Sequence, residues 1–104
     1  MQAGKKPRYP LADIKAAFAD AARINRTMTA TEGAEDLGMD EQAVVDVIQG
    51  LTATDFDKSM QDGRDPAVRQ DVYKPTLGGR ELYVKFRRDS RGGLLLLSFK
   101  ENDE

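Results

Sequence analysis

Three residue types are missing from this 104-residue chain: cysteine, histidine and tryptophan. Without cysteine there are no disulfides, thiolate nucleophiles or zinc–thiolate sites, as is usual for proteins of a reducing compartment. Without histidine, the usual general base near neutral pH is absent. No run of 18 apolar residues occurs, and Met1–Pro10 lacks the apolar stretch of a signal peptide. We therefore expect a soluble, cytoplasmic protein that does not associate with a membrane.

The familiar catalytic motifs are also absent. There is no GxSxG, no phosphate-binding GxxxxGK[ST], no HExxH and no Cys/His ligand spacing. The acidic residues between Glu32 and Glu41 resemble a metal site in composition. Their positions are better explained as helix caps and as partners of helix dipoles. We expect no metal and no other cofactor.

The net charge is only −2, but the charges are unevenly distributed. Residues 1–30 carry six basic and two acidic side chains, residues 31–65 two basic and ten acidic, and residues 66–104 eight basic and six acidic. If the two basic ends share a face, that face can attract a polyanion. A solvated surface with ordinary charge variation is the alternative, and charge alone favours it.

Helical spacing of apolar residues and helix-capping residues predict three helices in the first half of the chain. The first begins at Leu11 and ends near Arg23, and residues 24–29 alternate in the manner of a short strand. Thr31 is the predicted N-cap of the second helix, which ends at Gly38. The third is capped by Asp40, ends at Gly50, and has one apolar face formed by Val44, Val47, Ile48 and Leu51.

After Leu51 the apolar period changes from 3.6 to 2, which indicates strands. Turn sequences at Asp62-Gly63, Gly78-Gly79 and Arg91-Gly92-Gly93 separate four of them. They are expected at Phe56–Gln61, Val68–Pro75, Arg80–Arg88 and Leu94–Lys100. The sequence thus predicts a small α+β protein, one domain over residues 1–104, with helices packed on one face of an antiparallel sheet and an irregular segment at residues 1–10.

The parity of the last hairpin decides which side chains face solvent. Its two most apolar triplets are expected on the same buried side of the sheet: Leu82, Val84 and Phe86 on one strand, and Leu95, Leu97 and Phe99 on the other. A two-residue loop at Arg91-Gly92 satisfies this condition. Tyr83 then lies opposite Lys100 on the other face.

Two interpretations of that other face remain open. A tyrosine paired with lysine across strands is common on exposed sheet surfaces. Alternatively, Tyr83 stacks on a base while Lys85, Arg87 and Lys100 bind phosphate. In the middle strands, Lys58 is expected between Phe56 and Met60 in an apolar row, and Gln70 between two valines. A lysine that snorkels at a sheet edge and a pocket floor facing a ligand both explain this pattern.

The segments DLGMDEQAVVDVIQGLTATDFDKSM, QDVYKP, LYVKF and LSFKE follow one another in this order. Their succession closely resembles the MqsR family of toxin–antitoxin toxins, which are mRNA interferases with a RelE/YoeB-like fold. The resemblance extends from about Lys6 to Glu101. It implies a RelE-like fold and a ribosome-independent endoribonuclease that cuts single-stranded mRNA at short, GC-containing sequences.

The resemblance also implies an active site. The family's lysine of DFxKSM, glutamine of QDVY, following tyrosine and lysine of SFK correspond to Lys58, Gln70, Tyr83 and Lys100. The cations beside them, Lys85, Arg87, Arg69 and Lys74, are expected to bind RNA. The chain departs from the family pattern at Asp57, at Arg69 and in a longer hairpin tip, DSRGG.

A metal-free mechanism needs a base that activates the 2′-OH, cations that stabilise the phosphate, and an acid for the 5′-oxygen. The predicted base is Lys58, with its pKa lowered by burial and by neighbouring cations. Tyr83 is the predicted acid, and Gln70 is expected to orient phosphate or a base.

The resemblance further implies a protein antitoxin with zinc-binding and helix-turn-helix domains, through which DNA is contacted only indirectly. The acidic residues 31–65 are a possible contact surface away from RNA. Two alternatives remain: a non-catalytic RNA- or protein-binding module, and a ribosome-dependent interferase. Ribosome-dependent toxins are usually more basic than this chain, so the net charge favours the free-RNA enzyme.

Overall fold

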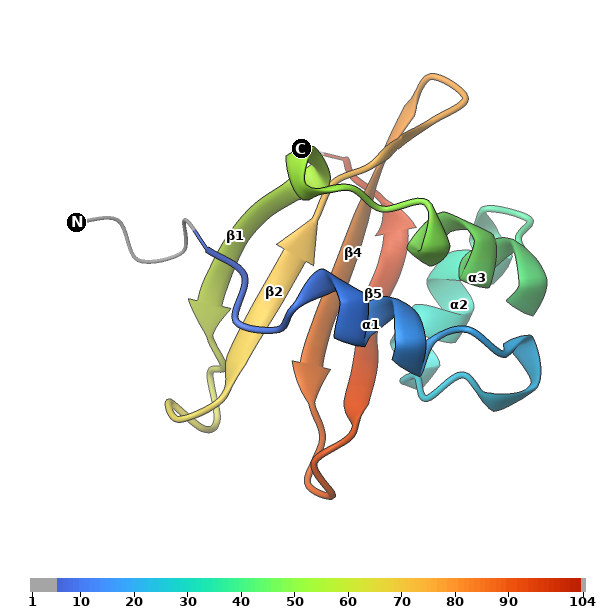
Figure 1. Ribbon diagram of the computed structural model, residues 1–104. Coiled ribbons are helices and arrows are strands. Elements are labelled where there is room, and N and C mark those ends of the chain that lie inside the picture. Colours follow the sequence, from blue (N-terminus) through green and yellow to red (C-terminus); the bar gives the residue numbers. More distant parts are fainter. Residues whose placement is uncertain (1–5, 104) are drawn as a thin grey trace.

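The computed structural model describes residues 6–103 and shows an antiparallel sheet flanked by helices (Figure 1). The helices are α1 (Leu11–Ala17), α2 (Met28–Asp36) and α3 (Glu41–Gln49), with short 3-10 turns η1 (Ala21–Arg23) and η2 (Ala53–Asp55). The strands are β1 (Phe56–Gln61), β2 (Arg69–Tyr73), β3 (Thr76–Leu77), β4 (Arg80–Arg88) and β5 (Leu94–Glu101). They are arranged β1-β2-β4-β5, and β3 pairs with the start of β4. The predicted α+β fold is confirmed.

The core lies between the sheet and its helices. In Figure 1, α1 crosses one face of the sheet, while α2 and α3 stand beside β5. Phe18, at the end of α1, is fully buried, and its ring lies 5.4 Å from that of Phe86 on β4. Side chains of this size each contribute roughly 1.5–3 kcal/mol when buried. The opposite face of the sheet has no such cover from α1, and this asymmetry defines where a site can lie.

The first helix is shorter than predicted, because α1 ends at Ala17 rather than near Arg23. The apolar stripe does continue as far as the buried Phe18. Beyond it, the Asp20 side chain accepts a hydrogen bond from the Ala22 N–H at 2.9 Å and begins the separate turn η1. A short polar side chain that bonds to a nearby backbone N–H competes with helix continuation.

The predicted strand at residues 24–29 is wrong, and it is reduced to one parallel bridge between Arg26 and Leu96 of β5. The helical N-cap also comes earlier than expected, at Thr27 instead of Thr31. The Thr27 hydroxyl accepts from the Ala30 N–H at 3.0 Å and donates to the Leu97 carbonyl at 2.8 Å. One residue therefore begins α2 and fastens it to the outer edge of β5.

The third helix agrees with its prediction. Asp40 accepts a hydrogen bond from the Ala43 N–H at 2.9 Å, and the helix is capped at its other end by Gly50. Val44, Ile48 and Leu51 are buried, as expected for one apolar face. Asp40 thus acts as a helix cap, which accounts for one acidic residue of the 31–65 segment.

The last hairpin reaches the predicted pairing by a different route. Tyr83 does lie opposite Lys100. The loop, however, is not the two-residue turn that was predicted, because the Asp89 N–H bonds to the Gly93 carbonyl at 2.7 Å and three residues lie between them. Gly92, within that loop, has a φ of 88°, a conformation that glycine adopts without steric cost.

A β-bulge in β5 compensates for the longer loop. Lys85 pairs with Ser98 but Phe86 pairs with Leu96, so Leu97 is the extra residue. Leu96 is consequently buried, whereas Leu97 is only half-buried. The prediction that Leu95 and Leu97 form the inner face is therefore wrong, while the part of the prediction that concerns Tyr83 and Lys100 is confirmed.

The segment before α1 is irregular over residues 6–10, and residues 1–5 lie outside the described part. It is nevertheless fixed to the sheet by the buried carboxylate of Asp71, which accepts from the Arg8 N–H at 3.0 Å and the Tyr9 N–H at 2.9 Å. The Tyr9 hydroxyl donates to the Arg69 carbonyl at 2.7 Å. Each helix within residues 6–103 is too short or too polar to cross a bilayer.

Candidate active site

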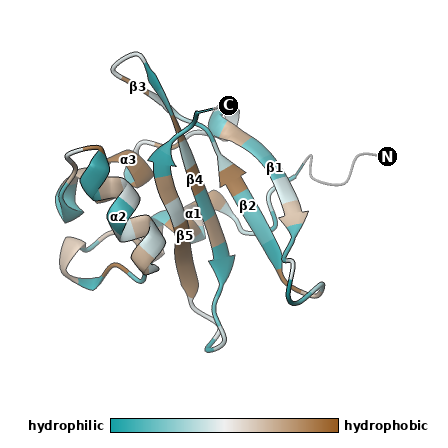
Figure 2. Cartoon of the chain, turned by 180° about the vertical axis from the view of Figure 1, so that it is seen from behind, coloured by the Kyte–Doolittle hydropathy of each residue, from teal (hydrophilic) through white to brown (hydrophobic). Residues whose placement is uncertain are grey.

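Basic and polar side chains gather on the sheet face opposite α1, which we call the open face. Residues directly opposite in an antiparallel pair share a face, so the strand register assigns them. Figure 2 shows this side of the sheet, with α1 behind the strands. The open-face side chains assigned in this way are Lys58, Met60, Gln70, Val72, Tyr83, Lys85, Arg87, Leu95, Ser98 and Lys100. All four predicted catalytic residues belong to this set.

Two lysines approach the ring of Tyr83. The Lys100 ammonium lies 5.5 Å from the ring centroid, and the Lys85 ammonium lies 5.7 Å from it. Both distances are within the range of cation–π attraction. Lys100 reaches the ring across the β4–β5 pair, and Lys85 reaches it from two residues along the same strand. The arrangement forms a cationic cluster around one aromatic ring, suited to an anion beside a base.

Lys85 is half-buried at the centre of this group of cations. Partial burial lowers the pKa of Lys85, and the charge of Lys100 and, to a smaller extent, that of Lys58 lower it further, against an opposing effect of Asp62. A lowered pKa increases the neutral fraction of an amine near physiological pH, and only the neutral amine can accept a proton. The sequence predicts Lys85 only as a residue that binds the substrate.

The predicted surroundings of Lys58 are wrong. A bulge at Asp57 places Phe56 opposite Tyr73 on the helix side, whereas Lys58 lies opposite Val72 on the open face. Phe56 packs edge-on against the ring of Tyr73, with the centroids 5.5 Å apart. Lys58 is exposed to solvent, with Val72 and Met60 as its apolar neighbours on the open face. It joins the open face as a solvated cation close to Lys85.

Gln70 is held by Asp62, a residue that the sequence predicts only as part of a turn. The Gln70 amide donates to Asp62 Oδ1 at 2.5 Å, and Nη1 of Arg87 donates to the same oxygen at 3.0 Å. Asp62 is in phase with Lys58 and Met60, so strand parity alone was a signal for its place on this face. The bonds of Asp62 to Gln70 and Arg87 depend on the pairing of β2 with β4, and the sequence alone does not reveal this pairing.

Two predicted RNA-binding cations are placed differently from the cluster. Arg69 points to the other face, where its Nη2 donates to the Ser59 carbonyl at 2.8 Å. Strand alternation requires this, since Arg69 precedes the open-face Gln70. Lys74 forms an ion pair with Asp57 at 3.5 Å, at the end of β2. The structure thus places the Arg69 side chain on the face opposite the four predicted catalytic residues, and the charge of Lys74 is partly balanced.

In residues 6–103, no three His, Cys, Asp or Glu side chains are grouped so that they could hold a metal ion. Among the acidic residues of α2 and α3, Glu41 forms a salt bridge with Arg26 at 3.2 Å. Together with the cap formed by Asp40, this bond gives two of these acids structural partners.

Comparison with known proteins gives two concordant matches. The family model described as "Motility quorum-sensing regulator, toxin of MqsA" matches residues 6–101. The chain belongs to the MqsR toxin family. A curated relative, the mRNA interferase toxin MqsR of Escherichia coli (strain K12), is 34% identical over 97 residues, which cover 93% of this chain and 96% of that protein.

The segments that resemble the MqsR family divide between the two faces of the sheet. In QDVYKP, Gln70 and Val72 face the open side, while the buried Asp71 holds the N-terminal segment and Tyr73 packs in the core. Burial, with a contribution from Asp71, raises the pKa of Tyr73 to about 12. Such segments therefore combine residues of the candidate site with residues that hold the fold together.

Proposed function

We propose that this MqsR-family chain is the toxin of a type II toxin–antitoxin system and cleaves single-stranded mRNA in the cytoplasm without a ribosome. The observation that carries the proposal is the convergence of Lys85 and Lys100 on Tyr83, with Lys58 near Lys85 on the same open face. An aromatic ring surrounded by ammonium groups suits a nucleotide, since the base can stack while the phosphate meets the cations. The name of the relative, an mRNA interferase, agrees with this chemistry.

In the proposed reaction the RNA's own 2′-OH is the nucleophile. A base removes its proton, the oxygen attacks the adjacent phosphorus, and the bond from phosphorus to the 5′-oxygen breaks. The products are a 2′,3′-cyclic phosphate and a 5′-OH end, so no water and no metal ion is consumed or required. The protein needs to supply a base, positive charge at the phosphate and a proton for the leaving oxygen.

Lys85 suits the role of base better than Lys58 does. The base must be neutral before it acts, and the pKa of Lys85 is lowered by partial burial and by Lys100. Lys58 is exposed, so it lacks the burial on which its predicted role as base depended. Lys58 instead supplies positive charge, both to the phosphate and to the environment that lowers the pKa of Lys85.

The remaining roles follow from position. Lys100 faces the ring of Tyr83 and can bind a phosphate oxygen, where charge develops during the attack. The ammonium groups of both lysines lie near the ring of Tyr83, and we assign its hydroxyl the proton donated to the 5′-oxygen. Gln70 contacts the nucleotide beside the cut. Arg87 bonds to the same Asp62 oxygen as Gln70 and lies beside it.

Regulation is proposed to come from a protein antitoxin with a zinc-binding domain and a helix-turn-helix domain. The family description names MqsA as the partner of the toxin. An antitoxin of this kind would also bring any DNA contact, since the open face of the toxin is assigned to RNA. The acidic surface of α2 and α3 remains our proposed contact region away from RNA.

The proposal predicts that the purified protein cuts RNA by itself. Incubated in EDTA without ribosomes, with a single-stranded RNA that contains all triplets, it is expected to produce discrete cuts at GC-containing sequences with 5′-OH ends. Lys100→Met, which removes a phosphate-binding charge, is expected to slow these cuts about 100-fold or more. Sequencing of the 5′ ends reads both the sites and the end chemistry.

Other outcomes assign the protein elsewhere. Cleavage that occurs only after ribosomes are added would make it a ribosome-dependent interferase. RNA that is bound in a salt-dependent way but stays intact with and without ribosomes would make it a binding module. Activity that EDTA removes would contradict the metal-independent mechanism.

A further inference from the structure

Asp62 is a buried carboxylate beside the open face, and each of its two oxygens accepts two hydrogen bonds. Its side chain is 7% exposed, and Oδ1 accepts from the Gln70 amide at 2.5 Å and from Arg87 Nη1 at 3.0 Å. Its Oδ2 accepts from the backbone N–H groups of Arg64 and Asp65, each at 3.1 Å. The hydrogen bond from Gln70 is the main cause that lowers the pKa of Asp62. The group is therefore an ionised carboxylate at neutral pH.

The charge of Asp62 fixes the orientation of the Gln70 amide. An ionised carboxylate only accepts hydrogen bonds, so the amide must turn its nitrogen toward Asp62. The amide carbonyl oxygen and the second N–H remain for a ligand. Because Gln70 is nearly buried, this acceptor and donor are held in place before any ligand arrives.

Two nitrogens of the Arg87 side chain also have hydrogen-bond partners within the protein. Its Nη1 bonds to Asp62, and its Nε donates to the Arg88 carbonyl at 3.0 Å, which leaves Nη2 for a ligand. Because Asp62 balances its charge, Arg87 attracts phosphate less than the lysines around Tyr83 do. Its remaining N–H groups are better suited to a neutral hydrogen-bond acceptor.

The register gives this pair apolar neighbours. Met60, Gln70, Arg87 and Leu95 form one row across β1, β2, β4 and β5. The next row of the open face includes Lys58 and Lys85. Neighbouring rows on one face are about 6.6 Å apart, so a single nucleotide can reach from one to the other. Met60 and Leu95 offer apolar surface at the two ends of the first row.

We propose that Gln70 and Arg87, held by Asp62, form a base-recognition subsite that selects a purine beside the phosphate bound by the lysine cluster. The subsite rests on the proposed function in one respect, that its ligand is single-stranded RNA. Paired hydrogen bonds from arginine read guanine, and those from glutamine read adenine, so both side chains favour a purine edge. Asp62 is a positioning residue, since it acts through the two side chains that it orients.

Asp62→Asn tests the orientation without removing the turn. The asparagine oxygen can still accept from the Arg64 and Asp65 N–H groups, but its NH₂ would now face Gln70 and Arg87. That NH₂ favours a reversed Gln70 amide and repels the guanidinium. We expect the base preference to change while the fold is kept. Gln70→Met removes the base contact at similar volume and leaves Asp62 in place.

The probes are dye-labelled 2′-O-methyl trinucleotides that differ only in the central base. They lack the 2′-OH, so binding is measured by fluorescence anisotropy whether or not the protein cleaves RNA. The wild-type protein is expected to bind the purine probes about tenfold more tightly than the pyrimidine probes. In Asp62→Asn and Gln70→Met this ratio is expected to fall at least fivefold, with pyrimidine binding unchanged. Asp65→Asn, an exposed change in the same turn, should keep the ratio.

Equal binding of all four probes by the wild-type protein would overturn the subsite, as would an unchanged ratio in Gln70→Met. If Asp62→Asn loses its fold in a thermal melt, the Gln70→Met ratio decides the question alone. Failure of the proposed function is seen separately, as intact all-ribose RNA in a parallel tube. Base-selective binding without cleavage would keep the subsite and reject the nuclease.

Discussion

Lys85→Met is expected to lower the single-turnover rate of RNA cleavage about 10²–10⁴-fold, the usual contribution of a general base. Methionine occupies a similar volume but cannot accept the 2′-OH proton. Lys85→Arg is expected to lose nearly as much activity, because a guanidinium keeps the charge but stays protonated. RNA affinity in Lys85→Arg should remain near that of the wild-type protein. The measurement is the cleavage rate at saturating enzyme, with affinity taken from its concentration dependence.

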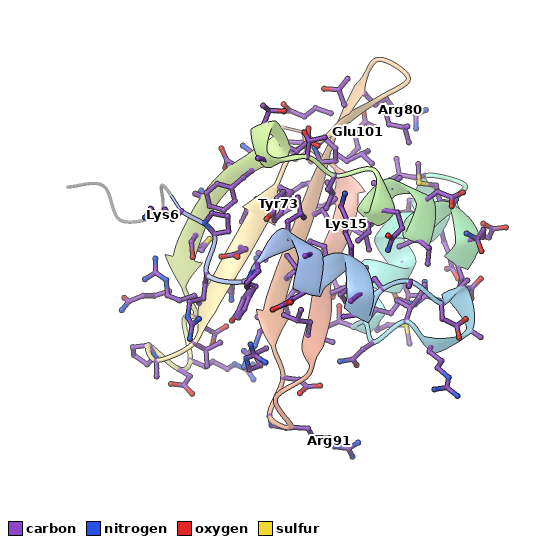
Figure 3. All side chains as sticks on the ribbon, viewed as in Figure 1. Lys6, Lys15, Tyr73, Arg80, Arg91 and Glu101 are labelled. Carbon is purple, nitrogen blue, oxygen red and sulfur yellow. The ribbon has the colours of Figure 1, made fainter. Side chains whose placement is uncertain are left out.

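The matched control is Lys15→Met, which removes a lysine from α1 on the other side of the sheet (Figure 3). Its cleavage rate should stay within about twofold of the wild type, the size of effect expected from a surface change. A Lys85→Arg variant that cleaves at the wild-type rate would contradict the assignment of Lys85 as base and leave it as a phosphate ligand.

The same assignment fixes the direction of the pH dependence. Because the neutral amine is the active form, the rate should rise with pH until the pH reaches the pKa of Lys85. That pKa lies below the ordinary lysine value of 10.5. Lys58→Met removes one of the charges that lower it, so the rising limb should move to higher pH.

Gly33→Ala is expected to destabilise the fold by about 2 kcal/mol, although alanine is the better helix former. A Cβ at Gly33 would collide with the Phe99 carbonyl oxygen and would lie 3.2 Å from the Cβ of Lys100. The gain in helix propensity is about 1 kcal/mol, whereas overpacking against a backbone oxygen costs up to about 3 kcal/mol. Helix α2 would have to move away from β5. A melting temperature lower by roughly 10 °C is expected.

Gly63→Ala provides the control, since a Cβ added there meets nothing within 4 Å. Its melting temperature should be close to that of the wild type. Gly33→Ala is also expected to slow RNA cleavage at temperatures where it is folded. The added Cβ would lie next to Lys100 and would displace this residue from its position in the site. A Gly33→Ala protein as stable as the wild type would show that α2 does not need this close approach to β5.

The alternation of apolar residues was sufficient to predict β1, β2, β4 and β5 and the pairing of Tyr83 with Lys100, but not the two-residue strand β3. It failed where a strand contains one extra residue. The bulge at Asp57 reverses the side to which Phe56 points, and the bulge at Leu97 does the same for Leu95. A bulge depends on the partner strand and on outside contacts such as that of Thr27 with Leu97, so neighbouring residues in sequence do not reveal it.

In the candidate site, too, some features follow from the sequence and others depend on how the strands pair. The resemblance to known toxins pointed to Lys58, Gln70, Tyr83 and Lys100, and the fold brings all four to one face. The role of Asp62 and the burial of Lys85 depend on which residues meet across three strands. Such properties arise from packing and cannot be obtained from the spacing of residues within one strand.

The most direct test of the account uses two RNA oligonucleotides that contain one mapped cleavage site. One has ribose at every position, and the other has a single 2′-deoxyribose immediately 5′ to the cut. We predict that the wild-type protein, in EDTA and without ribosomes, cuts the first to a 2′,3′-cyclic phosphate and a 5′-OH, and leaves the second intact at that position. Equal cleavage of both would show that the 2′-OH is not the nucleophile, and would contradict the mechanism built on the open face.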